Sequence, residues 1–208
     1  YLDLKRLDEA IASYCQALRL QPDFAEVHYN LGIALRKSGR LSEAIESCRE
    51  AIRLNPTYAE AYNNLGIAWQ EMGRHEEARA EFERALELKP DLADAYFNLG
   101  NLLRQWGRPR EALSYCERAV ELQPQSAAAR SNLGAVLQAL GRIPMARQAF
   151  ETALSLDANN VEAMANLAVV LVNERRPDDA IRTCQRVLQL DPSFELAHVH
   201  WGHALMQQ

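Results

Sequence analysis

The apolar residues of this chain fall in short runs with the spacing of amphipathic helices. A first run places its members on one helical face, at intervals of three and four residues: Tyr62, Leu65, Gly66 and Trp69. A second run opens near His75 and does the same with Ala78, Phe82, Ala85 and Leu86. Gly73 separates the runs, where the residue after a helix often needs a left-handed backbone. The pattern predicts two short helices joined by a tight turn.

This pattern repeats every 34 residues. Asn-Leu-Gly recurs at 30–32, 64–66, 98–100 and 132–134, and all nine glycines occupy two phases of the period. One helix pair is too small to bury its apolar face alone, so stacked pairs must share a core. The sequence predicts a single all-α solenoid over 1–208. Its parts are a partial repeat at 1–24, repeats at 25–58, 59–92, 93–126, 127–160 and 161–194, and a lone first helix at 195–208. Because the chain opens at Tyr1 inside a repeat, we expect a fragment of a longer protein.

The repeat resembles the signature of the tetratricopeptide repeat (TPR) family. The second repeat supplies the residues that carry the likeness: Tyr62, Leu65-Gly66, Ala78, Phe82, Ala85 and Pro90. The resemblance implies a right-handed α-α superhelical solenoid of TPR-like helix-turn-helix repeats, whose first helices line a concave groove. The fifth repeat departs from the signature, with Arg175 in place of the turn glycine and Ala168 in place of the helix glycine. We expect that repeat to turn less sharply.

By this resemblance, one inward position of the groove holds asparagine in five successive repeats: Asn30, Asn64, Asn98, Asn132 and Asn166. Asparagine is a mediocre helix former, so its recurrence indicates a gain elsewhere. An amide both donates and accepts, and could therefore pair with the backbone of a bound peptide. Alternatively, each asparagine bonds to the neighbouring repeat and sets the spacing between repeats. The column resembles that of O-linked N-acetylglucosamine transferases, whose inner asparagines hold extended substrate polypeptide.

The remaining groove positions suggest what kind of segment would bind. Carboxylates at an early first-helix position would repel a C-terminal carboxylate: Glu26, Glu60, Asp94 and Glu162. Of these, Glu26, Glu60 and Asp94 would favour basic side chains in a ligand. The first half of the groove is polar and offers Tyr29, Phe97, Arg36 and Arg104. The second half is apolar, with Ala165, Val169, Leu196 and Val199. We expect a ligand with a polar stretch over the first half and an apolar anchor near Val169.

The sequence offers no candidate for catalysis, for metal binding or for a cofactor. Cys48, Cys116 and Cys184 recur two repeats apart, too far for disulfides, which predicts buried thiols in a reducing, cytoplasmic compartment. In the last helix, His198 takes a packing position, whereas His200 and His203 face the groove. An in-phase row of arginines follows the first helices: Arg6, Arg40, Arg74, Arg108, Arg142 and Arg176. These arginines either stabilise the C-terminal ends of the first helices or form a basic ridge that binds acidic partners.

Charge and composition narrow the class of partner. The net charge is −5, from 23 basic and 28 acidic residues, which argues against nucleic acid. No apolar run approaches the roughly 20 residues of a membrane span, so we expect no membrane insertion. The sequence favours a non-catalytic scaffold that binds a protein or peptide in its groove. Two alternatives stay open: the substrate-recognition arm of a larger enzyme, such as an O-linked N-acetylglucosamine transferase-like glycosyltransferase, and a module that self-associates end to end.

Overall fold

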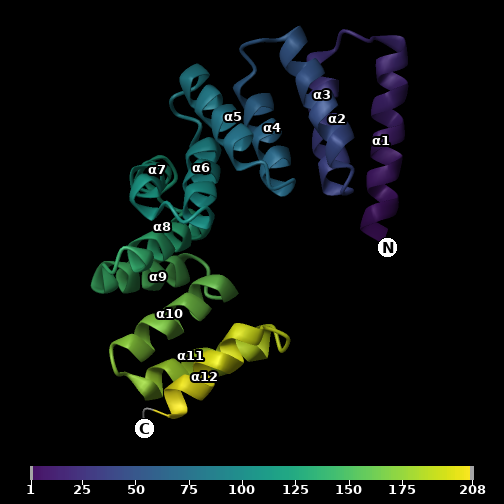
Figure 1. The fold of residues 1–208 in the computed structure, drawn as a ribbon. Coiled ribbons are helices and arrows are strands. Elements are labelled where there is room, and N and C mark those ends of the chain that lie inside the picture. Colours follow the sequence, from purple (N-terminus) through teal and green to yellow (C-terminus); the bar gives the residue numbers. More distant parts are fainter. Residues whose placement is uncertain (1, 207–208) are drawn as a thin grey trace. The chain divides into compact units, whose positions relative to one another are not determined.

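The computed structural model describes the backbone of residues 2–206 and the side chains of residues 6–206. These residues form twelve α-helices and no strand, which confirms the predicted all-α fold of helix-turn-helix repeats (Figure 1). The helices are α1 (Leu2–Leu20), α2 (Ala25–Lys37), α3 (Leu41–Leu54), α4 (Ala59–Glu71), α5 (His75–Leu88), α6 (Ala93–Gln105), α7 (Pro109–Leu122), α8 (Ala127–Ala139), α9 (Ile143–Leu156), α10 (Val161–Asn173), α11 (Pro177–Leu190) and α12 (Glu195–Leu205).

The chain divides into two compact units, unit 1 (Tyr1–Leu102) and unit 2 (Leu103–Gln208). In unit 1, α2 packs against α1 and α3, and α4 packs against α3 and α5. In unit 2, α8 packs against α7 and α9, α10 against α9 and α11, and α12 against α10 and α11. Each of these helices therefore contacts mainly the helices that are close to it in the sequence, as expected of a repeat protein.

The two helices of a repeat approach closely at a glycine. A Cβ atom built on Gly66 would lie 2.6 Å from Cε1 of Phe82, whose ring is fully buried, and the same distance recurs at Gly134. A glycine leaves room for a ring at this crossing because interiors are close-packed. The fifth repeat carries Ala168 and Cys184 at the corresponding positions, both fully buried. A thiol at this position does not by itself make room for the methyl group of Ala168, because a Cβ built on Gly32 would lie 2.7 Å from Sγ of Cys48.

The turn between the two helices has the same backbone in the fifth repeat as in the others. Gly141 has a φ of 74°, and Arg175 takes the same left-handed region with a φ of 56°. The closing hydrogen bond is also kept, because the Arg176 N–H donates to the Leu171 carbonyl at 2.9 Å, the length found at the Gly141 turn. The expected looser turn is therefore wrong. The fifth repeat keeps the turn, but with an arginine in a strained conformation.

Candidate functional site

Two asparagines of the column in unit 1 are held by a residue of the preceding repeat. Asn98 Nδ2 donates to Oδ1 of Asn63 at 3.0 Å. The Asn64 side chain is hydrogen-bonded to Tyr29, and its Nδ2 also donates to the carbonyl of Glu60 at 3.1 Å. Burial raises the pKa of the Tyr29 hydroxyl, and the bond to Asn64 partly offsets that effect. In both cases the partner stands 35 positions before the asparagine, which defines a clamp between successive repeats.

The clamp is not made at Asn166, in unit 2. The residue 35 positions earlier is Ser131, which is 3% exposed and whose Oγ has no hydrogen-bond partner among the residues described. Serine is shorter than the asparagine that holds Asn98, which accounts for the missing bond. Asn166 is half-buried and makes no side-chain hydrogen bond with the residues that the structure describes. Its amide is therefore available to a ligand.

A pocket opens beside Asn166. Its volume is about 390 Å³, and its walls come from the end of α6, from α10 and from α12 with the turn before it: Arg104, Glu162, Ala165, Asn166, Phe194, Leu196 and His200. Leu196 is 57% exposed, so an apolar side chain is offered to solvent beside a polar amide. Sequence reasoning missed Ser131 and Phe194. A comparison of the residues 35 positions before each asparagine could have indicated Ser131, because Asn98 has an asparagine there and Asn166 has a serine.

Arg104 contributes to the pocket from a fixed position. Its Nε donates to Oδ1 of Asn132 at 3.0 Å, and Asn132 Nδ2 in turn donates to Sγ of Cys116 at 3.5 Å. Asn132 is 8% exposed. This asparagine therefore orients the guanidinium of Arg104 and has little surface left for a ligand. Within unit 2, Asn166 is the more accessible member of the column.

Several predicted site residues of unit 1 are engaged within the chain. Glu60 pairs with Lys89 at 2.7 Å, and that contact lowers the pKa of the Glu60 carboxyl. Arg36 pairs with Glu71 of the next repeat at 2.6 Å. These contacts leave less of each side chain for a ligand.

The remaining predicted residues lie at the surface or partly so. Glu26 and Asp94 are exposed, and Phe97 and Val169 are half-buried. Asn30 is half-buried and makes no side-chain hydrogen bond with the residues described. Among these residues, Asn30 in unit 1 most resembles Asn166 in unit 2.

The row of arginines belongs to the second helices. Arg40, Arg108 and Arg176 each stand just before a second helix and bond a carboxylate three residues further on. Such exposed pairs contribute little to stability, typically about 0–1 kcal/mol. Because each of these cations has its own anion, the three arginines do not form a free basic ridge.

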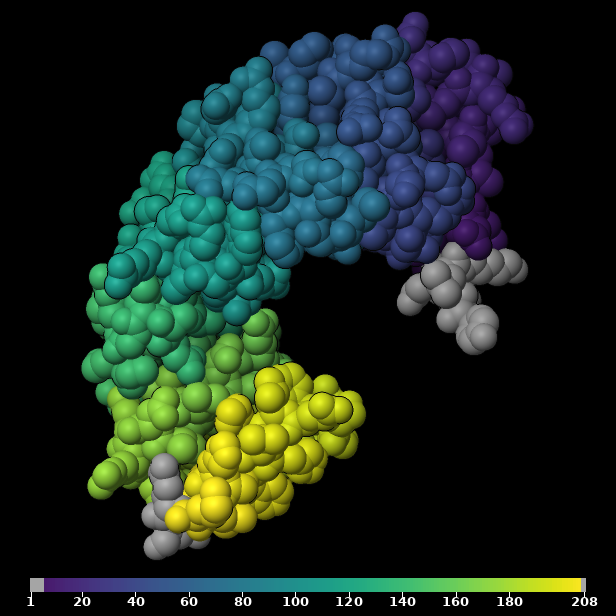
Figure 2. All heavy atoms as spheres, viewed as in Figure 1, coloured from purple at the N-terminus to yellow at the C-terminus, as the bar shows by residue number. Residues whose placement is uncertain are grey.

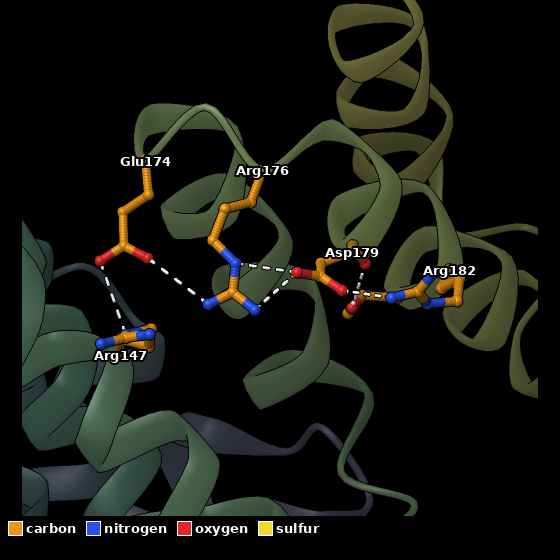
Figure 3. A network of polar contacts seen from close by, with 6 residues as sticks. Arg147, Glu174, Arg176, Asp179 and Arg182 are labelled. Carbon is orange, nitrogen blue, oxygen red and sulfur yellow. Dashed lines mark hydrogen bonds and ion pairs between the residues drawn. The ribbon is translucent and has the colours of Figure 1, made fainter. Parts of the chain in front are cut away.

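In unit 2 this pairing extends into a network (Figure 3). Glu174 lies between Arg147, at 3.5 Å, and Arg176, at 4.0 Å. Asp179 bonds both Arg176 and Arg182, and these contacts lower the pKa of its carboxyl. The network ties the turn of the fifth repeat to the preceding helix pair and therefore has a structural role.

Neither the cysteines nor the histidines that the structure describes form a reactive cluster. All four cysteines are free, and burial raises the pKa of the Cys48 and Cys116 thiols to about 12. His200 lines the pocket, and burial, with His203 nearby, lowers its pKa. The predicted packing position of His198 is wrong, because that side chain is exposed. Across the part of the chain that the structure describes, no three His, Cys, Asp or Glu side chains are placed to hold a metal ion.

Known family patterns match most of the chain. The tetratricopeptide repeat pattern matches residues 23–91, 57–125 and 91–159, and two related repeat patterns match 1–39 and 141–200. The chain belongs to the tetratricopeptide repeat family. Proteins of this kind mediate protein–protein interactions. Among the helices described, none is long and apolar enough to cross a membrane.

Solved structures show the same fold. YrrB, described as a TPR protein with an unusual peptide-binding site, is 25% identical with a TM-score of 0.70, over 89% of this chain and 96% of that one. PilF of Pseudomonas aeruginosa is 20% identical with a TM-score of 0.83, over 100% and 93% of the two chains. MamA from Desulfovibrio magneticus RS-1, from its residue 41 to the end, is 23% identical with a TM-score of 0.72, over 82% and 97%.

Among curated proteins none matches the chain. The likeness of the asparagine column to that of O-linked N-acetylglucosamine transferases finds no support in these comparisons. The clamps at Asn64 and Asn98, and the contact of Asn132 with Arg104, give three of the five asparagines a role inside the chain.

Proposed function

We propose that this chain is a scaffold that binds an extended segment of a partner protein along its first helices, with the pocket beside Asn166 as a principal contact. One observation carries the proposal. The amide of Asn166 lines an open pocket of about 390 Å³ and lacks the clamp that holds Asn98. A half-buried amide without a partner gains a hydrogen bond when a peptide backbone reaches it, typically about 0.5–1.5 kcal/mol net.

The chemistry of the walls suits a peptide. Binding sites commonly combine an apolar recess with a few fixed polar groups that set the orientation of the ligand. Here the recess is formed by Ala165, Phe194 and Leu196, and the polar groups are the Asn166 amide and the guanidinium of Arg104. The peptide-binding site of YrrB, at 25% identity, gives the proposal independent support.

A pair of matched variants tests this function. The 208-residue chain is screened against an array of peptides. The hits are then measured by fluorescence anisotropy with the parent chain, with Asn166→Ala and with Asn98→Ala. We expect Asn166→Ala to weaken binding by about fivefold, the equivalent of one hydrogen bond, with little change in stability. Asn98→Ala should lower stability through the lost clamp and leave the affinity for peptide nearly unchanged. The proposal fails if no peptide binds, or if Asn166→Ala binds as well as the parent chain.

A second candidate function, end-to-end self-association, is favoured by the surface of α12. Val199 is 48% exposed, Leu205 52% and Met206 78%, so several apolar side chains at this end of unit 2 face solvent. Figure 2 shows α12, in yellow, with a broad surface that no other described residue covers on the side in view. Exposed apolar side chains can mark contact sites where they gather on one face. Light scattering over a range of protein concentrations tests this, and a constant monomer mass would contradict it.

A further inference from the structure

The pocket beside Asn166 contains a carboxylate that no residue described by the structure neutralises. Glu162 lies in the first turn of α10, is exposed, and makes no ion pair with any residue that the structure describes. The corresponding carboxylate of the second repeat, Glu60, is paired with Lys89 at 2.7 Å. At the position that corresponds to Lys89, the fifth repeat has Asp191, another acid. Because Asp191 stands where the second repeat has a lysine, Glu162 lacks the cation that pairs with Glu60. The carboxylate of Glu162 can therefore pair with a cation of a ligand.

The other charged groups of the pocket do not replace that cation. Arg104 is half-buried, and its Nε is directed to Asn132 at 3.0 Å. His200 is half-buried, and burial favours its neutral form by lowering its pKa. Asp191 accepts hydrogen bonds from the N–H and the hydroxyl of Ser193, at 3.0 and 2.6 Å, and so caps the turn before α12.

An apolar surface adjoins the open carboxylate. Ala165 follows Glu162 by three positions on α10, so both residues lie on one face of that helix. Leu196, 57% exposed, and Phe194 line the same pocket from α12 and the turn before it. A ligand in this pocket therefore meets a carboxylate and an aliphatic surface within about one helical turn of each other.

We infer that the pocket selects partner segments in which an aliphatic side chain stands beside a lysine or arginine. The aliphatic group covers Leu196 and Ala165, the cation pairs with Glu162, and the backbone bonds the amide of Asn166. The inference rests on the proposed function and adds to it the chemical class of the ligand. Complementary charge at a partly exposed site contributes mainly to selectivity, which is what the experiment measures.

The experiment compares short fluorescein-labelled peptides in a glycine–serine background, carrying Leu-Lys, Leu-Glu or Ala-Lys at the centre. Binding to the 208-residue chain is followed by anisotropy at low salt, and by the NMR shifts of the Asn166 side-chain amide. We expect Leu-Lys to bind about fivefold more tightly than Leu-Glu and to shift the Asn166 signal, and Ala-Lys to bind more weakly than Leu-Lys. The preference for lysine should shrink when the salt concentration is raised to about 0.5 M.

Three variants decide the outcome. Glu162→Gln and Asp191→Lys should each remove the preference for Leu-Lys over Leu-Glu. Asp191→Lys does so by placing a lysine where the second repeat has Lys89, so that Glu162 is paired within the chain. Glu60→Gln is the matched control and should retain the preference. A preference for lysine that survives Glu162→Gln, or tighter binding of Leu-Glu by the parent chain, would overturn the inference. If array-selected peptides bind but none of these designed peptides does, the inference fails while the proposed function stands. If no peptide binds at all, both fail.

Discussion

Replacing Arg175 by glycine should stabilise the fifth repeat. Arg175 has a φ of 56°, in the region that glycine occupies in the corresponding turn at Gly141. A non-glycine residue there is destabilised by about 1–2 kcal/mol. Glycine gains more freedom in the unfolded chain, which offsets about 0.4–1 kcal/mol of that difference. The net change is therefore about 0.8 kcal/mol in favour of Arg175→Gly, or about 2–3 °C in the melting temperature of a chain this long.

The assay is urea unfolding followed by circular dichroism, with amide hydrogen exchange to locate the effect. Because stability in a repeat protein is close to a sum over neighbours, the added protection should be largest in α10 and α11. Gly141→Ala is the matched control. Apart from its own residue and the two chain neighbours, a Cβ added at Gly141 meets no atom within 4 Å, so its effect is confined to the backbone. That variant should lose about 0.8 kcal/mol by the same reasoning. An Arg175→Gly chain that is no more stable than its parent would refute the argument from backbone strain.

Three other perturbations follow from the structure. Gly66→Ala should lower the free energy of unfolding by about 1–3 kcal/mol, because its Cβ would lie 2.6 Å from Phe82, and a neutral effect in urea unfolding would contradict the packing argument. Of the thiols, exposed Cys15 should react with Ellman's reagent in the native state, and the three buried cysteines only after denaturation; rapid reaction of all four would be inconsistent with that burial. Burial lowers the pKa of His200 in the folded state, so the unfolded chain binds a proton more readily, and stability should fall as the pH drops below about 6.5. His200→Gln should flatten that pH dependence.

The periodic features of the fold could be predicted from the sequence, because they depend on local chemistry that recurs. The turn glycine is required by a left-handed backbone, as the structure shows at Gly73. The glycine at the helix crossing is required by close packing, as it shows at Gly66. The turn at Arg175 was expected to be looser, since an arginine is unfavourable there. The surrounding hydrogen bonds impose the left-handed backbone all the same.

The sequence could not predict which asparagines are hydrogen-bonded within the chain, because those bonds depend on contacts between repeats. The sequence shows an asparagine at 98 and at 166, but the difference between them lies in what stands opposite each one. That residue is Asn63 in one case and Ser131 in the other. The contact joins residues of two successive repeats, so it cannot be read from one repeat alone. The ion pair of Glu60 with Lys89 was missed for the same reason.

The second-helix position that faces the helix glycine carries a second period. It alternates between an aromatic ring and a thiol along the chain: Tyr14, Cys48, Phe82, Cys116, Phe150 and Cys184. The smallest unit after which the residue type at this position recurs is therefore two repeats, or 68 residues. An engineer who shortens or lengthens the array should add or delete two repeats at a time. Deleting one repeat would put two rings or two thiols in succession and break the alternation of large and small side chains.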